Sequence, residues 1–264
     1  NLYPFAEATS KENCDEALAL ENIDIGGPTM IRAAAKNLGW VCVAVDPNDY
    51  TNIADELKTT GKISFESRKS FSAKAFGHTA KYDTIIHNYF KSEKLSEDFS
   101  LTFTKHSDLR YGENPHQSGA AYKVSDGKDY NILNAHIRQG KKLSYNNIMD
   151  ADGALACVKE FDKPACVIVK HANPCGVAIG KNILEIYSRA FKADSLSAFG
   201  GIVAFNRKCT KEVAQEITSV FVEIVLAPSF EVEALEIFKK KKNLRILEIG
   251  DFSKRTSKLE VRNI

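Results

Sequence analysis

Short apolar runs alternate with amphipathic stretches through residues 101–264. Uninterrupted apolar runs of this length are typical of buried strands, and the amphipathic stretches between them are typical of helices. We predict a first strand within 101–117 that runs into a turn-rich loop, and further strands at 165–171, 200–206, 223–228 and 244–249. The helices are predicted at 146–161, 183–194, 211–221 and 230–243. This alternation favours an α/β fold with parallel strand pairings in a covered sheet.

The first hundred residues also predict an α/β arrangement. The stretch "WVCVAV" at 40–45 has the composition of a buried strand. A helix is expected before it, with Pro28 in the first turn and Gly39 just past the end. Further helices are expected at 52–61 and 64–90.

A polar, charged stretch without periodicity occupies residues 91–100, "KSEKLSEDFS". Such a stretch is typical of a linker between domains. We therefore predict two domains, 1–100 (linker included) and 101–264.

Composition excludes several classes of protein. Hydrophobic residues make up 44% of the 264 residues and charged residues 27%, as in ordinary globular proteins. The net charge of +2 calls for neither a nucleic-acid partner nor a membrane partner. No apolar run approaches the length needed to span a bilayer, and the first residues lack a signal-peptide pattern. The chain begins without Met, so we expect that this is not the biological start.

The six cysteines form no C-x-x-C pair, and each lies in or beside an apolar segment. This favours reduced thiols in a cytosolic protein over a disulfide framework. A zinc site at Cys175 is disfavoured, because Cys175 has no C-x-x-C partner and no H-x-E motif precedes it.

The stretch "NIDIGGPTM" offers a first candidate site. Asp24 precedes Gly26 and Gly27, which open a helix whose N-terminus can receive an anion or polarise a carbonyl. Lys36 lies twelve residues after Asp24. The alternative is structural: the two glycines make a tight turn, and Lys36 complements the helix C-terminus.

Two further stretches carry candidate binding groups. In "LRYGENPHQ", Arg110 and Tyr111 suit phosphate recognition, although an ordinary surface loop is equally compatible. In "SYNNIMDADGA", either Asn146 or Asn147 is expected to cap a helix. The other amide is then free to bind a ligand.

The stretch "VIVKHANPCG" ends an apolar run with Lys170 and His171. Neighbours on a strand point to opposite faces, so both reach one ligand only where the strand ends and the chain turns, which Asn173–Pro174 indicates. His171 would then act as a general base and Lys170 would stabilise negative charge. A purely structural histidine remains the alternative.

The stretch "ADSLSAFGGIVAFN" places Phe199 and Gly200 in a small-residue bend before a strand. Glycine permits close approach to a planar ligand, although a structural turn fits equally well. In "KKKKN", Lys242 belongs either to a solvated helix end or to a phosphate site. Together the stretches suggest a small phosphorylated substrate and acid–base chemistry without metal.

These stretches, with "NLYPF" and "LAPSFEVEAL", resemble the bifunctional purine-biosynthesis proteins that combine AICAR transformylase (phosphoribosylaminoimidazolecarboxamide formyltransferase) with IMP cyclohydrolase. The motifs follow the family's order over nearly the whole chain. The resemblance implies a partial methylglyoxal-synthase-like (Rossmann-like) cyclohydrolase domain, followed by one cytidine-deaminase-like transformylase subdomain. It also implies an internal fragment, without the family's first cyclohydrolase segment and its second transformylase subdomain.

For ring closure of FAICAR to IMP, the resemblance implies roles for Tyr3, Asp24 and Lys36, with the Gly26 turn beside them. Asp24 would handle the carboxamide proton, and Tyr3 and Lys36 would position the formyl group.

For formyl transfer from 10-formyltetrahydrofolate to AICAR, the resemblance implies Lys170 and His171 as the catalytic pair. Substrate-binding positions are implied at Arg110, Tyr111, Asn147, Phe199, Gly200, Glu223 and Lys242. The family uses folate as co-substrate and no zinc, forms homodimers, and is cytoplasmic. A nucleotide-binding fragment without turnover is the first alternative, and a zinc deaminase-like enzyme is a weaker one.

Overall fold

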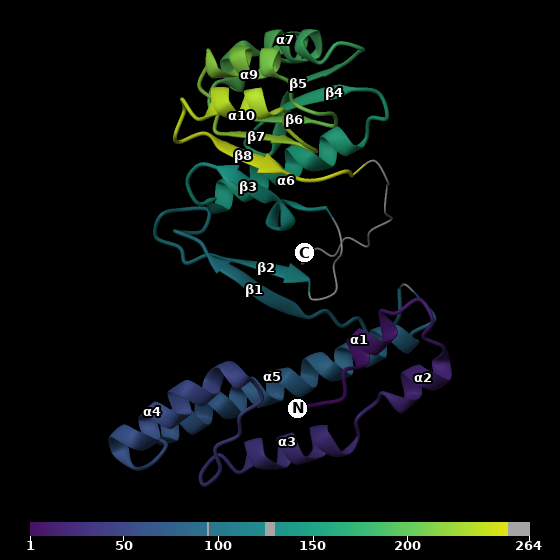
Figure 1. Ribbon diagram of the computed structural model, residues 1–264, viewed down its shortest axis with the longest axis vertical. Helices are drawn as coiled ribbons and strands as arrows, with labels where there is room; N and C mark the ends of the chain where they lie inside the picture. Colours follow the sequence, from purple (N-terminus) through teal and green to yellow (C-terminus); the bar gives the residue numbers. More distant parts are fainter. Residues whose placement is uncertain (94, 125–129, 253–264) are drawn as a thin grey trace. The chain divides into compact units, whose positions relative to one another are not determined.

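The computed structural model divides the chain into two compact units, Asn1–Thr102 and Phe103–Ile264. It describes residues 1–93, 95–124 and 130–252, and Figure 1 shows the elements of both units. The end of the second predicted domain, 253–264, lies outside the described residues. No helix among those described is both long and apolar enough to cross a membrane.

Unit 1 (Asn1–Thr102) is built from helices. They are α1 (Phe5–Thr9), α2 (Glu16–Glu21), α3 (Gly26–Lys36), the 3-10 helix η1 (Pro47–Asp49), α4 (Tyr50–Thr60) and α5 (Phe65–Phe90). The helices predicted here from sequence are confirmed. Helix α3 packs against α5, and this contact buries Ile31, Ala35 and Ala75.

The predicted strand at 40–45 is wrong, because residues 41–45 belong to no strand. A strand is stable only when its backbone groups pair with a neighbour, and the described part of unit 1 offers no other strand. Val43 and Val45 instead pack against the α3–α5 core. The chain as a whole is mixed α/β, and its described strands all lie in unit 2.

Unit 2 (Phe103–Ile264) contains both strands and helices. Its strands are β1 (Phe103–Asp108), β2 (Ala120–Val124), β3 (His136–Gln139), β4 (Ala165–Lys170), β5 (Asn173–Ile179), β6 (Ile202–Phe205), β7 (Ile224–Ala227) and β8 (Arg245–Glu248). Its helices are the 3-10 helix η2 (Ile132–Asn134), α6 (Tyr145–Lys159), α7 (Ile183–Ala193), α8 (Ser195–Ala198), α9 (Lys211–Thr218) and α10 (Val232–Phe238). The helices and strands predicted in this region are confirmed, whereas β2, β3 and β5 were not predicted.

The main sheet has the strand order β3-β8-β7-β6-β4-β5, and β1 and β2 form a separate antiparallel pair. Helix α6 covers one face of the main sheet, and α7, α9 and α10 cover the other (Figure 1). Alternate residues of β4 show this: Ile168 faces the core under α7, and Val167 and Val169 face α6. Burial on both faces explains why these strands read as unbroken apolar runs.

Pairing in the main sheet is only partly parallel. Strands β6, β7 and β8 are parallel to one another, but β4 is antiparallel to both β5 and β6. The sequence did not predict this reversal, because Asn173–Pro174 was interpreted as a turn. Residues Asn173–Ile179 form β5, and the turn consists of His171 and Ala172 alone.

Candidate functional site

Most of the predicted site residues of unit 2 lie along one edge of the main sheet, where β4 ends and β6, β7 and β8 begin. Because β4 is antiparallel to β6, its carboxyl end at Lys170 lies beside the start of β6. Gly200 precedes β6, and Glu223 precedes β7. Both residues stand at the starts of strands, on the side of the sheet where β4 ends.

The Lys170 side chain is half-buried, and its Nζ donates a hydrogen bond to the Gly200 carbonyl oxygen at 2.9 Å. Gly200 has φ +68°, and its own N–H donates to the Phe221 carbonyl oxygen at 2.8 Å. A Cβ on Gly200 would lie 3.1 Å from both Lys170 Nζ and the Phe221 ring. Glycine is therefore needed here by its backbone conformation and by the close packing of Lys170.

His171 is exposed at the tip of the β4–β5 hairpin. His171 and Ala172 have φ values of 53° and 59°, and positive φ at both central positions is typical of two-residue hairpin turns. The Ala172 N–H donates to Asp150 Oδ1 at 2.7 Å, and the Asn173 side chain donates to the His171 carbonyl oxygen at 2.8 Å. Non-glycine residues in this conformation cluster at functional sites.

Asn147 was expected either to cap α6 or to bind a ligand. Ser144 is the N-cap, and Asn147 completes a capping box with it. The Asn147 side-chain oxygen accepts from the Ser144 N–H, and the Ser144 hydroxyl oxygen accepts from the Asn147 N–H, both at 3.2 Å. Capping therefore uses the Asn147 oxygen, while its NH₂ group donates to no side chain or backbone group among the described residues.

Glu223 is half-buried and pairs with Arg245, with Nη1 and Oε2 2.6 Å apart. Its backbone N–H donates to the Gly201 carbonyl oxygen at 3.0 Å, which ties Glu223 to the glycine pair beside Lys170. The rings of Phe199 and Phe221 lie 5.3 Å apart, and both side chains are largely exposed. A carboxylate, an ammonium group and an exposed aromatic pair are thus gathered at one edge.

Cys175 lies in β5 and packs against the core under α7. Burial raises the pKa of its thiol. Among the residues that the structure describes, no group of three His, Cys, Asp or Glu side chains is placed to hold a metal ion.

Arg110 and Tyr111 lie in the loop between β1 and β2, with the guanidinium 5.8 Å from the centre of the Tyr111 ring. This loop belongs to the two-stranded sheet, and no hydrogen bond or ion pair joins it to Lys170 within the described residues. Lys242 is exposed and stands shortly before β8, on the side where Glu223 precedes β7. The structure therefore groups Lys242, but not Arg110, with the edge that carries Lys170.

In unit 1 the structure brings Asp24 and Tyr3 together. One Asp24 carboxylate oxygen accepts from the Gly27 N–H at 2.7 Å, and the other accepts from the Tyr3 N–H at 3.3 Å. The Asp24 N–H in turn donates to the Tyr82 hydroxyl oxygen at 2.8 Å. The Asp24 carboxylate therefore accepts a hydrogen bond from an N–H group at the start of α3, where the sequence predicted that a ligand would bind. Gly26 beside it is exposed, with open space around it.

Lys36 lies in the last turn of α3, whereas Asp24 stands just before its first turn. Twelve residues at the helical rise correspond to about 18 Å along the axis. The structure thus separates Lys36 from Asp24 and Tyr3, and a shared role for the three stays a prediction. Lys36 does stand where a cation complements the helix dipole.

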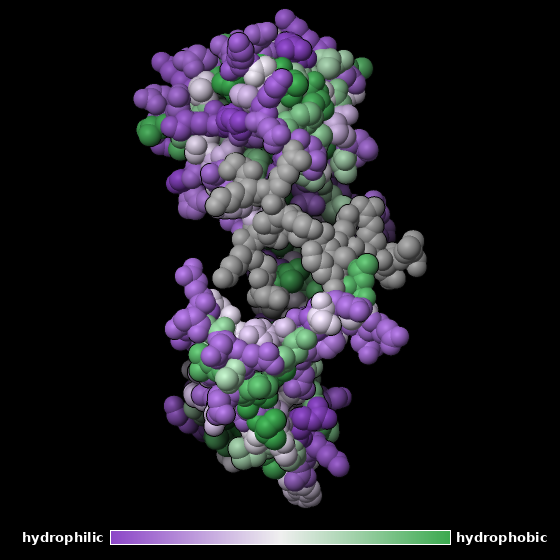
Figure 2. Space-filling view, turned by 90° about the vertical axis from the view of Figure 1, so that its right-hand side faces the viewer, coloured by the Kyte–Doolittle hydropathy of each residue, from purple (hydrophilic) through white to green (hydrophobic). Residues whose placement is uncertain are grey.

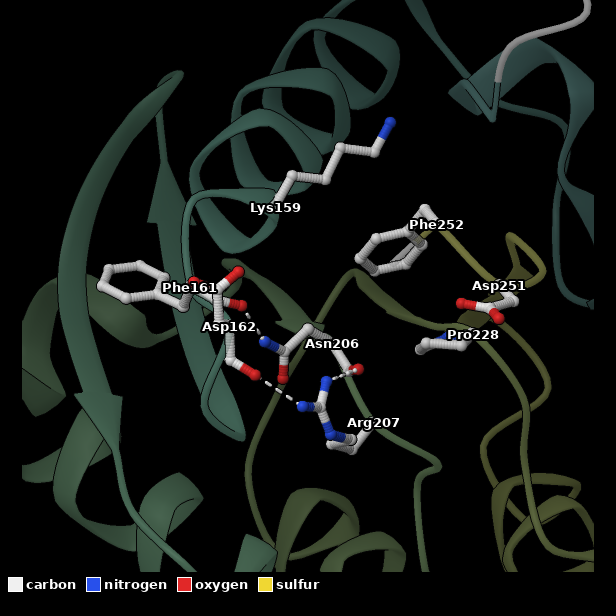
Figure 3. Close-up of a pocket in the computed structure, with 8 residues that line it drawn as sticks. All are labelled: Lys159, Phe161, Asp162, Asn206, Arg207, Pro228, Asp251 and Phe252. Carbon is white, nitrogen blue, oxygen red and sulfur yellow. Dashed lines mark hydrogen bonds between the residues drawn. The ribbon is translucent and has the colours of Figure 1, made fainter. Parts of the chain in front are cut away.

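A cavity of about 100 Å³ lies at the opposite edge of the main sheet, where β6, β7 and β8 end (Figure 3). Asn206 is 7% exposed and fully engaged there, donating to the carbonyl oxygens of Phe161 and Lys163 and accepting from the Ala165 N–H. Arg207 likewise donates to backbone carbonyl oxygens. Since these polar groups serve the backbone, we interpret the cavity as structural.

A comparison with protein-family models matches residues 34–264 to the family described as "AICARFT/IMPCHase bienzyme". The chain belongs to this family. The "Bifunctional purine biosynthesis protein PurH" of Bacillus cereus (strain B4264) is 52% identical over 253 residues, which cover 95% of this chain and 50% of that protein. PurH of Acetivibrio thermocellus is 51% identical over 98% of this chain and 51% of that protein. The chain thus spans about half the length of these curated relatives.

Among solved structures, "Acinetobacter baumannii RibD, form 1" matches 39% of this chain and 34% of that chain, at 15% identity and a TM-score of 0.29. A similarity this low supports no conclusion about fold or function. Placement of the chain in the AICARFT/IMPCHase family therefore rests on sequence.

Sequence analysis did not identify four residues that contact the predicted site residues of the two units: Tyr82, Asp150, Phe221 and Arg245. Tyr82 and Asp150 lie within helices, where a polar residue carries no distinctive signal. Arg245 did carry a signal, because a charged residue at the start of the apolar run 244–249 needs a partner if it is buried.

Proposed function

We propose that this chain carries part of a bifunctional enzyme for the last two steps of purine biosynthesis. These steps are formyl transfer from 10-formyltetrahydrofolate to AICAR, which gives FAICAR, and dehydrative ring closure to IMP. Family membership supports the proposal, and so does the arrangement of Lys170 and His171. Unit 1 would be the cyclohydrolase part, related to methylglyoxal synthase, and unit 2 a transformylase subdomain, related to cytidine deaminase.

The observation that carries the proposal is the end of β4. Lys170 Nζ is held 2.9 Å from the Gly200 carbonyl oxygen, and the next residue, His171, is exposed in the hairpin turn. A fixed ammonium group and an accessible imidazole are thereby presented at one edge of a rigid sheet. Catalytic groups need such pre-organised placement.

In the proposed formyl transfer, the 5-amino nitrogen of AICAR attacks the formyl carbon. The bond from that carbon to the folate nitrogen then breaks. His171 takes the proton that the amine loses, and Lys170 stabilises the oxyanion of the tetrahedral intermediate or protonates the folate nitrogen. Asn147 and Glu223 bind polar groups of the nucleotide, and Phe199 and Gly200 line its pocket. Arg110, Tyr111 and Lys242 bind its phosphate.

In the proposed ring closure, the carboxamide nitrogen attacks the formyl carbon and water is lost. Asp24 handles the carboxamide proton. Lys36 and Tyr3 position the formyl group. We further propose a cytoplasmic homodimer that uses folate as co-substrate and requires no zinc.

Turnover assays test the formyl transfer. This chain and the PurH of Bacillus cereus are assayed side by side with AICAR and 10-formyltetrahydrofolate. We expect turnover by the longer protein, and AICAR binding without turnover by this chain. In the longer protein, replacement of the residue aligned with Lys170 by Met, or of the residue aligned with His171 by Asn, should lower kcat at least ~100-fold.

Matched controls are the replacements aligned with Lys192→Ala and His136→Ala, whose side chains are exposed outside the site. Unchanged kcat in the Met and Asn variants would refute the assigned roles of the pair. Turnover by this chain alone would refute the expectation that turnover requires parts of the longer protein that this chain does not match.

A further inference from the structure

Arg245 is an almost fully buried cation at the edge that carries the candidate site. The residue is only 9% exposed. Its guanidinium donates to Glu223 Oε2 at 2.6 Å, and its Nε donates to the Lys141 carbonyl oxygen at 3.2 Å. The guanidinium therefore joins Glu223 to the segment that leads into α6.

The chain is fitted closely around this arginine. Gly140 has φ +107°, and a Cβ on it would lie 2.7 Å from the Cα of Arg245 and 2.9 Å from its Cγ. Glycine is thus the residue that allows the β3–α6 segment to approach Arg245. This packing confines the base of the Arg245 side chain, and the hydrogen bonds to Lys141 and Glu223 hold its guanidinium.

Stability alone does not account for a buried ion pair. Desolvation of the two charges consumes most of their attraction, and apolar residues of similar volume often serve the fold equally well. In another ion pair of the sheet, Arg138–Glu248, the arginine side chain is 40% exposed, so water screens it. The Arg245–Glu223 pair differs because its cation is buried while its carboxylate is partly exposed, at 35%.

The Glu223 carboxylate has capacity left for a ligand. Its backbone is fixed, because its N–H donates to the Gly201 carbonyl oxygen and its own carbonyl oxygen accepts from the Arg245 N–H. Arg245 occupies Oε2, while Oε1 accepts no hydrogen bond from the described residues. A carboxylate oxygen accepts hydrogen bonds, so Oε1 is available to a ligand that donates them.

We propose that Arg245 is a positioning residue that holds the Glu223 carboxylate toward a ligand which offers hydroxyl or amino hydrogens. This inference rests on the proposed function, because the ligand of that class would be the nucleotide AICAR. Arg245 itself is too buried to touch the nucleotide and acts through Glu223. Removal of the guanidinium should therefore weaken nucleotide binding by freeing Glu223.

The first measurement needs no ligand. Carboxyl groups of this chain are labelled with a water-soluble carbodiimide and an amine, and the labelling rate of Glu223 is followed by peptide mass spectrometry. We expect Glu223 to be labelled several-fold faster in Arg245→Met than in the parent chain. In Arg245→Lys the labelling rate should lie between these two values. Arg207→Met is the matched control, since that guanidinium donates to the backbone carbonyl oxygens of Asn206 and Asp162 at the opposite edge. Equal labelling of Glu223 in Arg245→Met and in the parent chain would overturn the inference.

The second measurement is AICAR binding by calorimetry, with folding checked by urea unfolding. We expect Arg245→Met and Glu223→Gln each to weaken binding at least ~10-fold. Their combination should be little worse than either alone, because both act through one contact. Fully additive losses, or unchanged affinity in Arg245→Met, would overturn the positioning role. Absence of AICAR binding by the parent chain would instead refute its proposed substrate. The carbodiimide labelling would then still test whether Arg245 restrains the Glu223 carboxylate.

Discussion

The Asp150 carboxylate accepts a hydrogen bond from the Ala172 N–H at 2.7 Å, and so connects α6 to the hairpin turn that carries His171. Ala172 is also packed closely, because a Cβ on Gly153 would lie 3.2 Å from its carbonyl oxygen. Helix α6 thus holds a turn whose positive φ values cost conformational energy.

Asp150→Ala should therefore destabilise unit 2 by about 1–2 kcal/mol, because a charged hydrogen bond to the turn is lost. Asp150→Asn should lose less, since the amide oxygen can still accept from Ala172. Urea unfolding measures both. The control is Asp152→Ala on the same helix, whose side chain is exposed and whose replacement should change stability by less than ~0.5 kcal/mol. An equal effect of the two alanine variants would contradict the assigned contact.

Gly200→Ala should lower stability by roughly 1–2 kcal/mol, because alanine is strained at φ +68°. Its methyl group would also press on Lys170 Nζ and on the Phe221 ring. Gly77→Ala is the matched comparison: Gly77 is exposed within α5, with open space around it, and alanine there should stabilise the helix by up to ~1 kcal/mol. Unfolding curves that shift in the same direction for both variants would disagree with this prediction.

Asn206→Ala should destabilise unit 2 by roughly 2–4 kcal/mol, since it leaves one buried N–H and two carbonyl oxygens without their partner. Chemical denaturation measures the loss. Asn243→Ala serves as control, because Asn243 is exposed beyond α10. If Asn206→Ala were as stable as the control, the cavity residues would not have the structural role given to them.

His78 should make unit 1 less stable in acid. Desolvation lowers the pKa of this histidine, whose Nε2 is buried without a hydrogen-bond partner among the described residues. The unfolded chain therefore binds the proton more readily than the folded chain. Stability should be lost as pH falls below the unfolded value of about 6.5.

The measurement for His78 is urea unfolding between pH 7.5 and pH 5. His78→Gln cannot take up this proton, so it should lose less stability than the parent chain over that range. His116→Gln replaces an exposed loop histidine and should follow the parent chain. Parallel pH curves for His78→Gln and the parent chain would count against the prediction.

Local signals predicted the longer helices, but not the short helices α1, α2 and α8. Pro28 lies in the first turn of α3, and Gly61 ends α4 with φ 71°, as local backbone preference requires. The buried strands β4, β6, β7 and β8 were equally visible, because burial on both faces leaves unbroken apolar runs. These features depend on neighbours in the sequence and can be read from it.

Pairing could not be read in the same way. Residues 40–45 have the composition of a strand and lack a partner, whereas β5 contains Pro174 and Gly176 and still pairs with β4. Strand formation depends on a neighbouring backbone from elsewhere in the chain, and composition carries only part of that information.

By itself the sequence determined the longer helices, the apolar strands, membership of the AICARFT/IMPCHase family and the choice of Lys170 and His171 as candidate site residues. Only the tertiary structure decided that β4 runs antiparallel to β6, so that Lys170 meets Gly200 at an edge where other strands begin. It alone also placed Asp150 under the turn and Arg245 against Glu223. Periodicity and capping act over a few residues, while these contacts join residues 22 or 30 positions apart that meet only once the sheet has formed.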